Sequence, residues 1–251
     1  MTFNIRNGRG LDGRNLWWLR RSATADVITA AAADVVCLQE VYRFQLRYLS
    51  KRLGAYDHVG VGRTDGARRG EACPVLYRRD RFEPERAETR WLSDTPGVPG
   101  SRSWGNRRPR IVTMAWLRDG VTGERVGVLN GHLDEASAPA RLRSARAIVR
   151  WLDEQDDRPW VVLGDLNTTA EDPAVRTLLD GGYRDTLADV PVRGPGAGTE
   201  HAWSGRDDGK RIDFVLVPAL WRVKDAHIVR ERPRGRLPSD HWPVVAVAAD
   251  R

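Results

Sequence analysis

The sequence predicts an α/β protein in which two packed β-sheets are covered by helices. Two observations lead to this fold class. Short apolar runs of strand length outnumber the helical stretches, and the two halves of the chain repeat one order of strand, helix and strand. In both halves the strands end in polar residues. We therefore expect two mostly antiparallel sheets, flanked by helices, whose polar strand ends gather at one rim.

The N-terminal part of the chain is predicted to form two strands and two helices. Residues 2–5 are a short strand. Residues 16–33 place apolar side chains at three- and four-residue spacing, which predicts a helix. Residues 34–40 are a buried strand that ends in the carboxylate of Glu40, and the spacing over residues 44–53 predicts a second helix.

The middle of the chain changes to short strands separated by turn-rich loops. Its β-branched and aromatic content predicts strands at residues 56–62, 74–78, 110–117 and 125–133. A long loop rich in Gly, Pro and Ser runs from Ser93 to Pro109, before the third of these strands. Long loops in compact domains are often functional.

The C-terminal part combines helices with further strands. An apolar stripe predicts a helix over residues 138–154, and a shorter helix starts near Pro173. The remaining apolar runs predict strands at residues 160–164, 212–217, 223–230 and 242–248.

Length and charge limit the architecture and the partner. A chain of 251 residues can bury a large core and contains no stretch that resembles a linker, so we expect one domain over residues 1–251. The net charge of +7 suits a polyanionic partner such as nucleic acid. However, only 3 of the 41 basic residues are lysine, a bias that GC-rich genomes also produce, so the charge does not identify that partner.

Cysteine usage and hydropathy point to a reduced compartment. Two cysteines cannot form a disulfide framework, and neither has the neighbouring cysteine of a zinc site. No apolar segment approaches the about 18 residues of a membrane span, and the N-terminus lacks a signal-peptide pattern. We expect a cytoplasmic protein without a membrane span, and the sequence indicates no particular oligomeric state.

Polar residues suited to phosphate ester hydrolysis lie at the ends of the apolar runs. Asp240 and His241 stand immediately before a buried strand, so a rigid element holds both side chains. The other runs carry Asn4, Glu40, His132, Asp165, Asn167 and Asp213. Taken singly, each could be an ordinary cap or turn residue. Together their oxygens suit Mg²⁺ or Mn²⁺, and the two histidines can move protons near neutral pH.

The order of these motifs resembles the endonuclease/exonuclease/phosphatase superfamily. The motifs are Thr2-Phe3-Asn4, Leu38-Gln39-Glu40, Gly131-His132-Leu133-Asp134, Gly164-Asp165-Leu166-Asn167, Arg211-Ile212-Asp213 and Ser239-Asp240-His241. The linking stretches at residues 61–66, 70–71 and 91–96 resemble a bacterial branch related to the deadenylase-like members. This resemblance implies a four-layer α/β sandwich and Mg²⁺-dependent cleavage of a phosphate ester.

The resemblance also implies roles for the metal ligands and the base. Glu40 would be the main metal ligand, and Asn4 and Asp240 would lie close to the metal or its waters. His241, oriented by Asp213, would be the general base that activates water.

Two further motifs would act on the phosphate group. Asp165 and Asn167 would lie around the phosphate and the attacking water, with Asn167 donating a hydrogen bond to a phosphate oxygen. His132 would hold the phosphate or protonate the leaving group, with Glu71 as a partner for its imidazole. The motifs leave open whether Asp165 or the second histidine accepts the proton.

The chain departs from the family pattern beside the first histidine. Gly131 stands where the family usually has Thr, which affects strand packing, and Glu135 replaces a frequent His at the rim. His201 precedes an aromatic residue by two positions and either lines the pocket or fills the core. Arg141, nine residues after His132 and at a helix start, is a candidate substrate-binding residue.

Three functions are consistent with these residues. The first is an Mg²⁺-dependent phosphoesterase that acts on a phosphorylated small molecule, a nucleotide or a short substrate. The second is a nuclease that uses the same site on DNA or RNA. The third is a binding protein that has kept the fold and lost catalysis, which measurable turnover would exclude.

Overall fold

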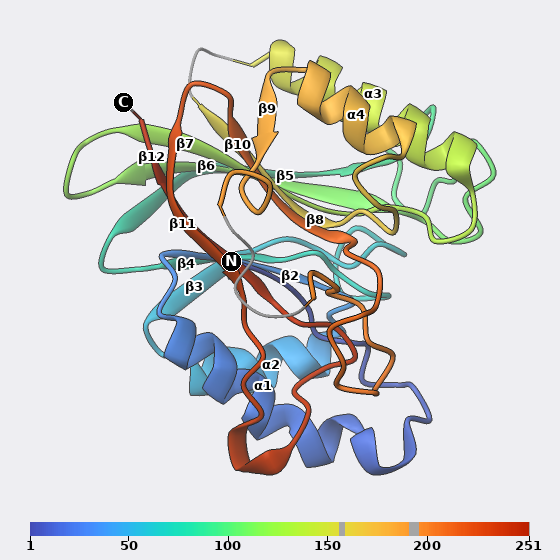
Figure 1. Cartoon of the computed structure of the whole chain (residues 1–251). Coiled ribbons are helices and arrows are strands. Elements are labelled where there is room, and N and C mark those ends of the chain that lie inside the picture. Colours follow the sequence, from blue (N-terminus) through green and yellow to red (C-terminus); the bar gives the residue numbers. More distant parts are fainter. Residues whose placement is uncertain (156–158, 191–195, 251) are drawn as a thin grey trace.

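Two β-sheets pack face to face and carry helices on their outer faces, which makes four layers (Figure 1). The computed structural model describes residues 1–155, 159–190 and 196–250. Each sheet has six strands, and all but one pair of neighbours in each sheet run antiparallel. The predicted fold class, a four-layer sandwich with mostly antiparallel sheets, is confirmed.

The first sheet contains both ends of the sequence. Its strands follow the order β11 (Arg222–Ile228), β12 (Val244–Ala249), β1 (Thr2–Asn4), β2 (Val35–Gln39), β4 (Val75–Arg78) and β3 (Tyr56–Val59). Only β1 and β2 are parallel neighbours. Helices α1 (Trp17–Ala31) and α2 (Arg43–Arg52) cover its outer face, where Trp17, Ile28 and Leu49 pack with Phe3 and Leu38. Burying this apolar surface holds the helices on the sheet.

The second sheet repeats this plan. Its strands follow the order β5 (Phe82–Trp91), β6 (Ile111–Asp119), β7 (Arg125–His132), β8 (Trp160–Asp165), β10 (Asp213–Pro218) and β9 (Tyr183–Asp185). Only β7 and β8 are parallel. Helices α3 (Ala138–Asp153) and α4 (Pro173–Asp180) cover the outer face. Short 3-10 helices occur at Gly13–Asn15 and Pro233–Gly235.

Two strands of the second sheet are absent from the sequence prediction, and both lie at its edges. β5 has a polar sequence and exposes most of its length, so it lacks the apolar pattern that identifies a buried strand. β9 has only three residues. Edge strands depend on hydrogen bonds from a neighbouring strand, which the local sequence does not specify.

Two amide side chains join the sheets in the middle of the sandwich. Gln39 on β2 donates from Nε2 to Oδ1 of Asn130 on β7 at 2.7 Å. Asn130 in turn donates to the carbonyl oxygens of Leu38 and Pro74 at 2.9 and 2.8 Å. Both amides are 0% exposed. Because an unpaired buried amide is costly, this bridge fixes the position of one sheet against the other.

The two parallel pairs end at the same rim of the sandwich. Asn4 at the end of β1 is level with Gln39 on β2. His132 at the end of β7 is level with Asp165 at the end of β8, which also pairs with Asp213 at the start of β10. The predicted gathering of polar strand ends at one rim is therefore confirmed. Among the described residues, no helix is long and apolar enough to span a bilayer.

We predict that Gly164→Ala destabilises the protein because two strands approach closely at this position. Gly164 pairs with Gly131 across β7 and β8, and a Cβ added there would lie 2.1 Å from the backbone oxygen of Gly131. Forcing the strands apart should lower the free energy of unfolding by about 1–3 kcal/mol, measurable by urea denaturation. Gly131→Ala is the control, since its Cβ would meet side chains and no backbone, with Val112 at 3.3 Å and Leu129 at 4.0 Å. Equal losses in both variants would contradict this account.

Candidate active site

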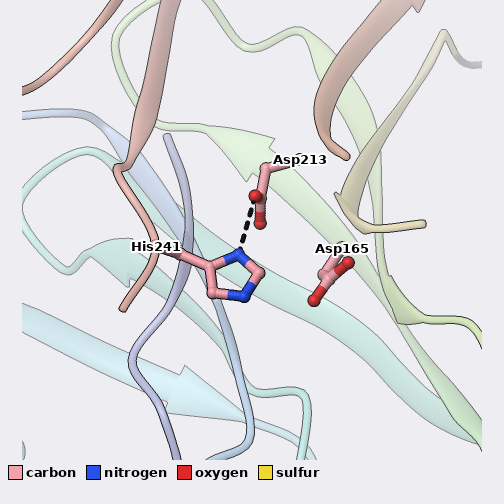
Figure 2. A group of neighbouring side chains, drawn as sticks. All are labelled: Asp165, Asp213 and His241. Carbon is pink, nitrogen blue, oxygen red and sulfur yellow. Dashed lines mark hydrogen bonds and ion pairs between the residues drawn. The ribbon is translucent and has the colours of Figure 1, made fainter. Parts of the chain in front are cut away.

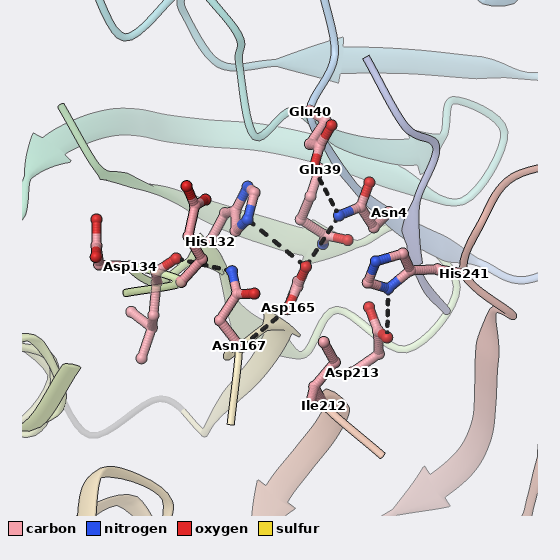
Figure 3. A network of polar contacts seen from close by, with 12 residues as sticks. Asn4, Gln39, Glu40, His132, Asp134, Asp165, Asn167, Ile212, Asp213 and His241 are labelled. Carbon is pink, nitrogen blue, oxygen red and sulfur yellow. Dashed lines mark hydrogen bonds and ion pairs between the residues drawn. The ribbon is translucent and has the colours of Figure 1, made fainter. Parts of the chain in front are cut away.

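Asn4 connects the polar ends of the two sheets (Figure 3). Its amide nitrogen donates to Oε1 of Glu40 at 3.2 Å and to Oδ2 of Asp165 at 2.9 Å. Its amide oxygen accepts from the backbone nitrogen of Arg6 at 2.9 Å. Asn4 therefore holds two carboxylates, one from each sheet, next to each other.

Glu40 is held as an ionised carboxylate where the chain turns out of β2. Its backbone has φ 62, a region that residues other than Gly enter rarely and that is common at functional sites. Both the backbone and the side-chain nitrogen of Asn7 donate to Oε2, at 2.9 and 3.0 Å. Burial opposes the charge, but His132 and the Asn7 hydrogen bonds outweigh it and lower the pKa of Glu40 to about 2.

His241 and Asp213 form a buried imidazole–carboxylate pair (Figure 2). Nδ1 of His241 lies 2.9 Å from Oδ2 of Asp213, and the two residues are 6% and 0% exposed. Burial alone would lower the pKa of this imidazole, yet Asp213, Asp165 and Asp240 raise it well above its usual range. The second ring nitrogen, Nε2, points towards Asp165. Asp213 thus fixes the ring and leaves Nε2 free for proton transfer.

His132 has the opposite electrostatic environment. Its Nε2 lies 3.6 Å from Oδ2 of Asp165 (Figure 3), but burial and the neighbouring guanidinium of Arg110 lower the pKa of His132 well below its usual range. The site therefore shifts the pKa values of its two histidines in opposite directions. This separation is typical of a site in which two groups have different proton-transfer roles.

Asp165 lies between the two histidines and retains a proton more readily than an ordinary aspartate. Burial and the nearby charge of Asp213 raise the pKa of Asp165 to about 7. Its Oδ1 accepts from the backbone nitrogen of Asn167 at 2.9 Å. Asn167 has φ 52 and donates its side-chain amide to the Leu133 oxygen at 3.0 Å, which keeps it at the rim beside Asp165.

The loop that carries Asp240 is tied to the N-terminal strand. Ser239 donates from Oγ to the backbone oxygen of Asn4 at 2.7 Å and to Oδ1 of Asp240 at 3.2 Å. The buried guanidinium of Arg20 donates to the oxygens of Pro238 and Ile5 at 3.0 and 2.7 Å. Contacts between the two ends of the sequence therefore place Asp240 beside the other carboxylates.

The donor atoms of the site fit a hard divalent cation. Asp165, Asp213 and His241 each offer a ligand atom, and these atoms lie within 4.8 Å of one another. Glu40 and Asp240 add further carboxylates, and burial and the charge of Glu40 both act to raise the pKa of Asp240. This excess of buried negative charge and of oxygen donors suits Mg²⁺ or Mn²⁺ rather than zinc.

Three of the predicted site residues have contacts that differ from the expected ones. Glu71 pairs with Arg63 at 2.8 Å rather than with the imidazole of His132. Glu71 and His132 nevertheless line the same small recess, together with Glu40. Arg63 and Glu71 are both nearly buried, so the pair neutralises two charges that would otherwise be costly.

Arg141 and His201 are committed to contacts inside the protein. Arg141 donates to the Asp134 oxygen at 3.0 Å and lies 3.4 Å from Asp172, so it supports the loop after β7. His201 packs against Trp242 with ring centroids 4.3 Å apart, and burial lowers the pKa of its imidazole to about 4. Nε2 of His201 is buried without a hydrogen-bond partner among the described residues. Of the two places that the sequence left open for His201, the structure shows the buried one, against Trp242.

Sequence reasoning missed Asn7 and Arg20. Asn7 lies in the basic turn after β1, and Arg20 lies within a helix that was identified by its apolar residues. The signal that the sequence offers for Arg20 is a charged residue on the apolar side of the predicted helix. In the structure this side is buried, and Arg20 is 1% exposed.

Comparisons with known proteins agree with the geometry. A model of the Endonuclease/Exonuclease/phosphatase family matches residues 1–241. The structure of an endonuclease/exonuclease/phosphatase from Bacteroides vulgatus has a TM-score of 0.93 at 34% identity, covering 100% of this chain and 97% of that one. A mannosyl-6-phosphatase of Bacteroides thetaiotaomicron has a TM-score of 0.91 at 27% identity, covering 99% and 98% of the two chains.

Among curated relatives, nocturnin of Drosophila melanogaster is 23% identical over 279 residues. The match covers 91% of this chain and 41% of nocturnin. The chain thus spans less than half the length of the curated relatives it matches.

The raised pKa of Asp165 predicts a pH-dependent stability in the metal-free protein. Its folded-state pKa of about 7 exceeds the ordinary value of 3.8. The folded state therefore binds this proton more tightly than the unfolded state does. This binding stabilises the folded state fully below about pH 4, and the stabilisation is lost as the pH rises through about 7. In EDTA, Asp165→Asn should reduce the loss of unfolding free energy between these pH values. Urea denaturation across that range measures it, and an unchanged pH slope would refute the assignment. The exposed Asp208→Asn is the control.

Proposed function

The chain belongs to the endonuclease/exonuclease/phosphatase family, and we propose that it uses Mg²⁺ to hydrolyse phosphate monoesters of small molecules. Members of this family are metal-dependent hydrolases of phosphate esters, which gives the chain its reaction class. One observation carries the proposal. Carboxylates from both sheets converge on a buried imidazole–carboxylate pair at the shared rim.

We assign the metal site to Glu40 and Asp240. Glu40 is ionised at any neutral pH because its pKa is about 2. Asn4 presents its amide nitrogen to the carboxylates, so we assign it to positioning Glu40 rather than to direct ligation. A divalent cation bound there would neutralise the charge that develops on the phosphate in the transition state.

We assign the general base to His241. Its Nε2 would take a proton from the attacking water while Asp213 stabilises the resulting imidazolium through the 2.9 Å contact at Nδ1. The imidazole of His241 must be neutral before it can accept this proton. A divalent cation bound beside Asp165 and Asp240 would lower the pKa of His241 and so favour the neutral imidazole. Asp165, which has a pKa of about 7, is the second candidate for this proton.

The remaining polar residues suit the phosphate and the leaving group. His132 is neutral, so it can donate a hydrogen bond from one ring nitrogen to a phosphate or leaving-group oxygen. Asn167 lies at the rim next to Asp165 and would donate to a non-bridging oxygen once its bond to Leu133 is exchanged. These donors would stabilise the charge that develops on the phosphate oxygens in the transition state. Because the protein already holds them in place, they would do so more effectively than water.

A small substrate is supported by the likeness to the mannosyl-6-phosphatase, which extends over nearly the full length of both chains. The alternative, a nuclease, is favoured by the net charge of +7. We also infer that residues 1–251 form one domain, because β1 and β12 from opposite ends of the sequence are neighbours. A cytoplasmic location stays a prediction of the sequence.

Phosphate release and strand cleavage, measured side by side, separate the two functions. The purified chain is incubated with Mg²⁺, Mn²⁺ or EDTA and a panel of sugar phosphates, nucleotides and short DNA and RNA oligomers. We expect metal-dependent phosphate release from a sugar phosphate or nucleotide and intact oligomers. Cleaved oligomers without release from any small ester would establish the nuclease instead.

We predict that His241→Ala lowers kcat by about 10² or more, because water then loses its base. His227→Ala is a matched control, since His227 also lies against an aspartate, 3.1 Å from Asp225, but belongs to none of the predicted motifs. Both variants should unfold at similar temperatures. Turnover near the wild-type rate in His241→Ala would remove the imidazole from the chemistry and favour Asp165.

We predict that Glu40→Gln raises the Mg²⁺ concentration needed for half-maximal activity by about tenfold or more, because a neutral amide replaces a charged ligand. The control is Glu88→Gln on β5. The carboxylate of Glu88 lies 2.6 Å from Nε of Arg90 and belongs to none of the rim motifs. An Mg²⁺ titration of the initial rate measures the effect. If both variants keep the wild-type titration, the metal binds elsewhere.

A further inference from the structure

A second cavity opens beside the candidate active site, between α2 and the loops that follow β3. It has a volume of about 390 Å³, within the range of small-molecule sites. Val41 and Ala72 line one end, where they pair with each other in an isolated β-bridge. These two residues directly follow Glu40 and Glu71, so the cavity adjoins the recess of the active site. We call this cavity the α2 groove.

Four cationic side chains line the α2 groove. Arg43, Arg47 and Lys51 come from α2, and Arg68 comes from the loop between β3 and β4. The three residues on α2 are four positions apart, so they lie along one face of the helix. Like charges at this spacing repel one another and destabilise an isolated helix. The arrangement therefore carries a cost that a bound anion would remove.

None of these four cations forms an ion pair within residues 1–155, 159–190 and 196–250. Neighbouring arginines do have partners: Arg52 on the same helix lies 3.7 Å from Asp26, and Arg63 lies 2.8 Å from Glu71. Neither of these paired arginines is among the residues that line the α2 groove. The groove contains no Asp or Glu among its lining residues.

The rest of the lining is apolar or small. Leu46 and Val61 contribute aliphatic surface, and Gly60 and Gly62 contribute backbone atoms to the floor. Ser50 and His58, whose Oγ and Nδ1 lie 3.5 Å apart, add groups that can hydrogen-bond to a hydroxyl. These groups would contact the organic part of a phosphate ester, and the cations would contact its phosphate.

We propose that the α2 groove is a second, non-catalytic binding site for a small organic phosphate. Cations without a carboxylate partner suit the phosphate group. The absence of carboxylates from the described lining means that the groove offers no ligands for the metal that hydrolysis requires. A phosphate held here is bound without being cleaved. Binding at the groove does not depend on the reaction proposed for the rim, so the two proposals fail separately.

Calorimetric titration in EDTA tests this site directly. The whole chain is titrated with ribose 5-phosphate, with inorganic phosphate and with a short oligothymidylate. We expect ribose 5-phosphate to bind more tightly than inorganic phosphate, because the floor contacts the ring. Arg47→Gln should weaken this binding by about tenfold, since one charge-assisted hydrogen bond is lost. Arg52→Gln, an equal charge change on the opposite side of the same helix, should leave the affinity within about twofold.

The variant also has an expected effect on folding. Arg47→Gln removes the middle cation of the three on α2, so its unfolding temperature should equal or exceed that of the wild type. Three results would overturn the proposal: no binding of ribose 5-phosphate, equal weakening by Arg47→Gln and Arg52→Gln, or equal affinities for ribose 5-phosphate and inorganic phosphate. Binding of the oligomer alone, sensitive to Arg47→Gln, would assign the groove to a nucleic acid strand instead.

Discussion

The amide bridge between Gln39 and Asn130 is the contact on which the geometry of the site depends. Both side chains are completely buried and 2.7 Å apart, one from each sheet. A slip of one sheet would leave buried amides unpaired, at a cost of about 1–3 kcal/mol for each group. Glu40 directly follows the first of these residues, and His132 comes two residues after the second. The bridge therefore sets how far apart the two halves of the site can be.

Electrostatics then gives the two histidines different states within one cluster. His241 is surrounded by Asp213, Asp165 and Asp240, which raise its pKa against the effect of burial, whereas burial and the guanidinium of Arg110 lower the pKa of His132. Asn4 donates to carboxylates of both sheets and so limits the repulsion between them. The cluster remains rich in negative charge, which is the physical reason that a divalent cation fits it.

Helix α2 connects the candidate active site with the proposed phosphate site. It begins three residues after Glu40, and Gln45 in its first turn accepts from Gly8 and donates to the Arg6 oxygen on the active-site side. Its cationic face, which includes Arg47, lines the groove instead. A ligand in the α2 groove would thus contact a helix that also supports the loop around Glu40. The two sites share one structural element and differ in charge.

The sequence by itself determined the strands with buried apolar runs, the helices that carry an apolar stripe, the family and the chemical nature of the rim residues, because all of these are encoded in local periodicity and in motif order. The tertiary structure alone decided the edge strand β5, the pairing of Glu71 with Arg63, the support of Glu40 by Asn7 and the cationic lining of the α2 groove. Such features depend on partners that are not neighbours in the sequence, such as Asn7 and Glu40, which are 33 positions apart. Residue type and spacing specify which groups are available, whereas packing of the two sheets decides which of them meet.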